Sequence, residues 1–85
     1  MNNALKLDGL KYTAVDMKRW VPQMTKPTHV LTICHMLMNN IKSLRGTVPK
    51  DIKDKLKQPN LTLKQLRKIA LNLASALDKA VTKRL

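Results

Sequence analysis

Apolar residues in the segment 60–85 recur at the three- and four-residue spacing of an amphipathic helix. On a helical wheel its leucines and alanines share one side, and Lys64, Lys68 and Lys79 lie on the other. Thr62 and Gln65 match the Thr-x-x-Gln capping box, which marks the start of a helix. The pattern predicts a long helix over about 62–84, whose apolar side is formed by Leu66, Ile69, Ala70, Leu73, Leu77, Ala80 and Val81.

A second long helix is predicted over about 27–45. Pro27 suits the first helical position, and Gly46 suits the residue just past the end. Its apolar stripe is wide enough to be buried, and the small alanines of 62–84 allow a close approach, so we expect these two helices to pack together. The stripe consists of Val30, Ile33, Cys34, Leu37, Ile41 and Leu44.

Two short helices complete the pattern, over about 14–21 and 49–57. Thr13 is a candidate cap for the first, and Pro22 is expected to stop it. The residues before Thr13 are weakly patterned and contain the turn signal Asp8-Gly9, so we expect a weakly structured lead-in over 1–12.

No alternation of apolar and polar residues persists long enough to predict a strand. Leu, Met and Ala dominate the apolar set, and all three favour helices. The chain of 85 residues is long enough for one small domain. We therefore predict an all-α, single-domain bundle of about four helices, with the helical domain over 13–85.

The charge of the chain indicates a binding protein rather than a helical bundle with no particular partner. Lys and Arg number 17 against five Asp and no Glu, which gives a net charge of +12. Twelve of the 17 cations fall within 42–57 and 60–85, an asymmetry typical of a one-sided electrostatic surface. Such a charge destabilises a compact chain by self-repulsion unless an anionic partner relieves it.

The sequence lacks the residues that catalysis or metal binding requires. Cys34 lies in an apolar stripe, and together with His29 and His35 it offers too few ligands for a metal site. Gly9 and Gly46 are the only glycines, so a Gly-rich phosphate loop is missing. We expect a protein that is not an enzyme and has no cofactor.

The cellular setting is expected to be cytoplasmic, or the host cytoplasm if the source is viral. A single cysteine rules out an intrachain disulfide, which argues against a disulfide-stapled secreted scaffold. The N-terminus lacks the apolar core of a signal peptide, and no apolar run approaches the roughly 18 residues of a membrane span.

Nucleic-acid phosphates are the predicted partner, DNA more than RNA, in a regulatory or accessory role. Phosphate contacts by Lys and Arg supply most non-specific affinity, whereas Tyr12 and Trp20 are the only aromatics available to stack single-stranded bases. A homodimer would suit paired DNA half-sites. The predicted contacts come from 49–57 and the start of 62–84: Lys50, Lys53, Lys57, Lys64, Arg67 and Lys68.

Two other function classes stay open on sequence grounds. An inhibitor or modulator docking on the acidic surface of a protein, such as a polymerase or nuclease, would use the same charge to steer association. A membrane-active protein would lay a basic amphipathic helix on anionic lipid. The membrane alternative is disfavoured because the long helices can bury one another's apolar sides and because Trp20 is the sole interfacial aromatic apart from Tyr12.

Overall fold

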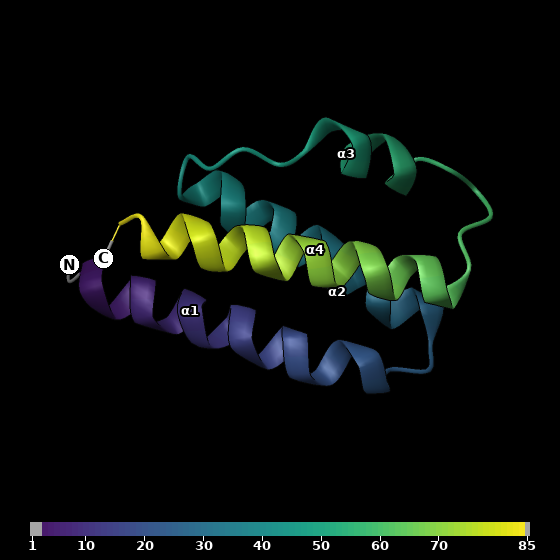
Figure 1. Ribbon diagram of the computed structural model, residues 1–85, viewed down its shortest axis with the longest axis horizontal. Coiled ribbons are helices and arrows are strands. Elements are labelled where there is room, and N and C mark those ends of the chain that lie inside the picture. Colours follow the sequence, from purple (N-terminus) through teal and green to yellow (C-terminus); the bar gives the residue numbers. More distant parts are fainter. Residues whose placement is uncertain (1–2, 85) are drawn as a thin grey trace.

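The computed structural model describes the backbone of residues 3–84 and the side chains of residues 6–84. It confirms the all-α prediction: four α-helices and one 3-10 turn make up the described chain, with no strand among these residues (Figure 1). The elements, in chain order, are α1 (Asn3–Trp20), η1 (Val21–Gln23), α2 (Pro27–Ser43), α3 (Lys50–Leu56) and α4 (Leu63–Thr82).

Helix α4 is the centre of the bundle. Both other long helices, α1 and α2, pack against it, α1 running antiparallel to it and α2 in the same direction (Figure 1). Helix α3 lies on the side of α4 away from α1 (Figure 1). The predicted packing of α2 on α4 is therefore confirmed, and the apolar side of α4 contributes most to the core, with Leu66, Ile69, Ala70, Leu73, Ala74, Leu77 and Val81 all buried.

The capping signals place both long helices as the sequence predicts. Thr62 is the N-cap of α4: its hydroxyl accepts from the Gln65 backbone N–H at 3.2 Å, and the Gln65 side chain accepts from the Thr62 N–H at 2.9 Å. This is the reciprocal capping box, which satisfies two N–H groups that the helix itself leaves unpaired. Pro27 occupies the first position of α2, where its missing N–H costs nothing.

Helix α1 is much longer than the helix predicted over 14–21. It begins at Asn3, so residues 3–12 are helical rather than a weakly structured lead-in, while residues 1–2 lie outside the described chain. The Asp8-Gly9 turn signal was misleading because a mid-helix glycine costs only about 1 kcal/mol, which packing readily offsets. The packing comes from a stripe at helical spacing against the core: Leu7, Leu10, Ala14 and Met17.

The side chains of α1 differ from the sequence prediction at the expected cap. Thr13 does not cap a helix start; its hydroxyl donates to the Gly9 carbonyl, one turn back, at 3.0 Å. The apolar residues Val15 and Trp20 are half exposed, since the side of α1 that faces α4 is the one carrying Ala14 and Met17. The helix ends at Trp20, ahead of Pro22, as predicted.

The end of α2 is a Schellman motif with an unusual occupant. The Gly46 N–H donates to the Ile41 carbonyl and the Arg45 N–H to the Lys42 carbonyl, both at 2.9 Å. Arg45, not Gly46, is the residue in the left-handed region, with a φ of 57°. Gly46 is needed for another reason: a Cβ there would lie 2.9 Å from Ile41 Cγ2 and 3.2 Å from the Ile41 carbonyl oxygen.

Helix α3 is held by few side chains. It has seven residues, of which Ile52 is buried and Leu56 half-buried. Val48 is buried before α3, and Leu61 packs against the core after it. The segment therefore contacts the core at separate points along its length. The segment 44–61 arches over one side of α4 (Figure 1).

Candidate anion-binding face along α4

Two hollows lie between α4 and the arching segment 44–61. The larger, of about 500 Å³, is framed by the Leu44–Thr47 turn and the C-terminal half of α4. The smaller, of about 240 Å³, lies between α3 and the first half of α4. The α4 residues that line them, with Lys83 just after the helix, fall within about 120° of arc and so form one face: Gln65, Lys68, Ile69, Asn72, Ala76, Lys79, Ala80 and Lys83.

Both hollows are lined by cations. Arg45, Lys79, Lys83 and Arg84 border the larger, and Lys55 and Lys68 border the smaller. None of the described residues lining either hollow is acidic. We refer to the two hollows and these six cations as the basic face. Lys68 to Lys83 span 15 residues of helix, so at 1.5 Å per residue the face is about 22 Å long.

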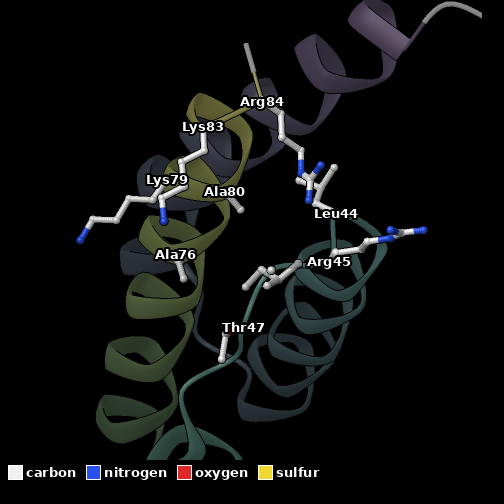
Figure 2. Close-up of a pocket in the computed structure, with 10 residues that line it drawn as sticks. Leu44, Arg45, Thr47, Ala76, Lys79, Ala80, Lys83 and Arg84 are labelled. Atoms are coloured by element: carbon white, nitrogen blue, oxygen red, sulfur yellow. The ribbon is translucent and has the colours of Figure 1, made fainter.

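Figure 2 shows how the cations surround the larger hollow. The Arg84 side chain is directed from the end of α4 toward Leu44, while the Arg45 guanidinium extends outward from the turn (Figure 2). Lys79 and Lys83 extend from α4 on the other side (Figure 2). Small residues, Ala76, Ala80 and Thr47, lie between them, and their size is what leaves the space open.

The aspartates do not neutralise this face. Asp78, the only acid of α4, lies about 140° around the helix from Lys83 and forms an ion pair with Lys18 of α1, Nζ to Oδ2 at 3.2 Å. Because both side chains are partly exposed, we expect this pair to contribute little to stability. Asp51 and Asp54 are exposed on α3 and line neither hollow.

Arg45 holds its place on this face in a strained backbone conformation. Left-handed backbone costs an L-residue roughly 1–2 kcal/mol, and glycine is the usual occupant of this position in the motif. Here glycine stands one residue later, and a long cation takes the left-handed position beside the larger hollow. Strain of this kind is typical of functional positions, where a side chain is kept for what it does.

The six residues predicted from sequence are distributed over three environments. Lys50, Lys53 and Lys57 are exposed on or just after α3 and line neither hollow, and Lys64 is exposed at the start of α4. Lys68 is the one predicted residue that belongs to the basic face. Whether any of the six contacts an anion stays a prediction.

Arg67 has a structural contact that the sequence does not reveal. It lies about 100° from Lys68 on the helix, is half-buried, and its Nε donates to the Met24 carbonyl at 2.9 Å. Its Nη2 donates to the same oxygen. The guanidinium thereby ties α4 to the connection between η1 and α2, which is a forked contact that lysine cannot reproduce.

Five cations of the basic face are absent from the sequence prediction: Arg45, Lys55, Lys79, Lys83 and Arg84. A partial signal exists, because Lys68, Lys79 and Lys83 recur on one helical face. Nothing comparable marks Arg45 or Lys55, which reach this face only because the segment 44–61 folds back over α4.

Cys34 is a core residue, as the sequence indicates. It is fully buried, and burial raises the pKa of its thiol from 9.0 to about 11, while the thiol makes a long contact of 3.9 Å to the Leu66 carbonyl oxygen. A buried neutral thiol is a poor nucleophile and a poor metal ligand. No cluster of three or more His, Cys or Asp side chains suited to a metal ion occurs within the described part of the chain.

Comparison with known protein families, curated proteins and solved structures finds no match to this chain. Among the described residues, none of the helices has both the length and the apolar character needed to cross a bilayer. The chemistry of the basic face is therefore the main guide to function.

Proposed function

We propose that this protein binds the phosphate backbone of nucleic acid, duplex DNA in preference to RNA, along the basic face of α4. The observation that carries the proposal is that six cations line two hollows whose described lining has no acid. Residues far apart in sequence, such as Arg45 and Lys83, line the same hollow only in the folded chain.

The dimensions suit a polyanion better than a small ligand. A face about 22 Å long spans roughly six phosphates of one DNA strand, since each nucleotide of a strand advances 3.4 Å along the helix axis. The hollows are partly open to solvent and lined by cations, so they offer electrostatic contact rather than the deep apolar burial that small-molecule sites usually provide. Binding is consequently expected to depend on backbone phosphates and to discriminate little between base sequences.

The direct test is the salt dependence of binding to a short fluorescent DNA duplex, measured by anisotropy. If all six cations contact phosphates, the logarithm of the association constant falls with the logarithm of salt concentration with a slope of about −5. Replacing Lys68, Lys79 and Lys83 by Gln should reduce that slope by about 3.

Two matched triple variants distinguish binding at the basic face from attraction by net charge and from contacts on α3. Lys11, Lys26 and Lys42 line neither hollow, so replacing them by Gln removes the same charge and should change the slope by less than about 1. Replacing Lys50, Lys53 and Lys57 by Gln tests the contacts that the sequence predicts on α3. If all three triple variants lower the slope equally, binding reflects net charge alone and the basic face is not the site.

Arg45 offers a more demanding variant. Arg45→Gly relieves the left-handed strain and should make the protein more stable by about 1 kcal/mol while reducing the slope by about 1. A variant that is more stable yet binds DNA more weakly cannot be explained by misfolding. Unchanged binding in this variant would remove Arg45 from the site.

The alternative of an acidic protein partner is an outcome of the same assay. Polyglutamate of matched charge is added as a competitor against the labelled duplex. Competition weaker than that of unlabelled DNA supports the phosphate backbone, since phosphates lie at fixed spacing along the face. Competition by polyglutamate at lower charge concentration than DNA would favour an acidic protein surface instead.

A further inference from the structure

Helix α1 carries every large apolar side chain that the described chain leaves exposed. Tyr12 is 71% exposed, and Val15 and Trp20 are each 49% exposed. Tyr12 and Trp20 are also the only aromatic residues of the protein. Helix α1 lies along one edge of the molecule (Figure 1), and the exposure of these three side chains shows that no other described element covers them.

These side chains share one face of the helix. At 100° per residue, Val15 and Trp20 lie 60° and 80° from Tyr12, one on each side of it. Charged exposed residues lie within the same arc. We call this set the outer α1 face: Asp8, Tyr12, Val15, Asp16, Arg19 and Trp20. Arg19 lies over the Trp20 ring at 5.8 Å from its centroid, and Tyr, Trp and Arg are the residues that dominate the energy of protein interfaces.

The charge of this face points to a second copy of the same chain as the partner. A net charge of +12 makes two copies repel each other over most approaches. The outer α1 face is different, since it holds two of the five aspartates of the chain and a single arginine. It is therefore locally acidic, and it is the side on which another copy meets the least repulsion.

We propose that two copies pair through their outer α1 faces, antiparallel and related by a two-fold axis. An isologous contact must be self-complementary, so each residue and its partner exchange roles across the axis. When the two-fold axis passes between Thr13 and Ala14, Tyr12 lies opposite Val15 of the partner subunit, and Arg19 lies opposite the partner's Asp8. Both pairs of residues are centred on this axis. The symmetry therefore forms each contact twice.

We expect the affinity of this dimer to be low and to increase with salt concentration. One pair of 18-residue helices buries an area at the low end of specific interfaces, so we expect a dissociation constant in roughly the micromolar range. Screening of the remaining positive charge favours association, whereas a purely ionic contact would weaken with salt. The proposal does not depend on nucleic-acid binding, because no residue of the outer α1 face lines either hollow of the basic face.

The first experiment is sedimentation equilibrium of the full chain across a concentration series, at low and high salt, without nucleic acid. A monomer–dimer equilibrium that tightens with salt is expected. Replacing Tyr12 and Val15 by Ser should weaken it at least about tenfold. Circular dichroism checks that the variant stays folded, since both side chains are exposed. A monomer at every concentration, a larger oligomer, or a dimer untouched by this variant would overturn the proposal.

The second experiment tests the register by exchanging charges. Asp8→Arg and Arg19→Asp should each weaken the dimer, because each places like charges opposite each other twice. The double variant, with both changes, restores opposite charges and should recover the dimer. Asp16→Arg in place of Asp8→Arg serves as the control and should not be rescued by Arg19→Asp. Failure of the double variant to recover association overturns this antiparallel pairing.

Discussion

Arg67 and Lys68 are neighbouring cations with opposite surroundings. Arg67 donates twice to the Met24 carbonyl and is half-buried, whereas Lys68 is exposed beside the smaller hollow. Their formal charges are equal, so the sequence alone treats them alike. Only the helical position, about 100° apart, sends one inward to the η1–α2 connection and the other toward α3.

The Arg67→Met variant should lose about 1–3 kcal/mol of unfolding free energy, because the Met24 carbonyl loses a charged, forked partner. Lys68→Met removes the same charge at an exposed position and should change stability by less than about 0.5 kcal/mol. Urea denaturation monitored by circular dichroism compares the two. Equal losses would mean that the hydrogen bonds to Met24 contribute nothing beyond charge.

Cys34 gives the folded state a pH dependence at the alkaline end. Its pKa is about 11 in the folded chain against an ordinary 9.0, so the neutral thiol is favoured by folding. The stability that this difference contributes is fully present below pH 9.0 and is lost as pH rises toward 11.

The difference in unfolding free energy between the wild type and Cys34→Ala should therefore shrink as pH rises between these values, at up to about 1.4 kcal/mol per pH unit. Comparing the two chains removes every other pH-dependent contribution, which they share. A difference that stays constant across this interval would show that the thiol is not shielded from water in the way its burial implies.

At the scale of elements, the two glycines show how local signals and packing compete. Gly9 stands within α1, where an added Cβ would have no neighbour within 4 Å. Gly46 follows α2, where an added Cβ would lie 2.9 Å from Ile41 Cγ2. The first glycine weakens a helix without any compensating contact, whereas the second is required by the close approach of the turn to α2.

Gly9→Ala should consequently stabilise the protein by about 0.5–1 kcal/mol, the difference in helix propensity between the two residues. Gly46→Ala should destabilise it, since Ile41 or the turn must shift to admit the methyl group. Thermal denaturation of the two variants, which carry identical chemical changes, gives opposite shifts of the midpoint. A destabilised Gly9→Ala variant would contradict the helical conformation of α1 around Gly9.

The elements that sequence reasoning predicts correctly are those with periodic apolar residues and explicit caps. Helix α4 has both, with the Thr62–Gln65 capping box observed as predicted. The start of α1 was missed because its stripe of Leu7, Leu10, Ala14 and Met17 is sparse and interrupted by Gly9. Of the basic face, only Lys68 was predicted, because the approach of Arg45 and Lys55 to α4 depends on the path of a long connection.

At the scale of the whole molecule, the net charge of +12 opposes compaction. The described chain offers one ion pair, Lys18 with Asp78, to offset it. Unlike the contacts discussed above, this repulsion acts over long distances and is weakened by dissolved salt, because the Debye length falls from about 30 Å at 0.01 M to about 8 Å at 0.15 M.

The midpoint temperature should accordingly rise as sodium chloride is added, by several degrees for each kcal/mol of relieved repulsion, given the usual scaling for a domain of this size. Differential scanning calorimetry at low protein concentration separates this effect from dimerisation. The variant with Lys11, Lys26 and Lys42 replaced by Gln should respond less, since it has less repulsion to relieve. A midpoint that falls with salt would indicate that attractive ion pairs outweigh repulsion.

The central place of α4 has a consequence for how the chain is made. Helices α1 and α2 each find their main packing partner in α4, which is synthesised after both of them. While the ribosome is still translating α3, the apolar stripes of the two earlier helices have no surface to bury against. Folding of this protein must therefore wait for the last helix to emerge, and a message truncated before residue 63 would yield an aggregation-prone product.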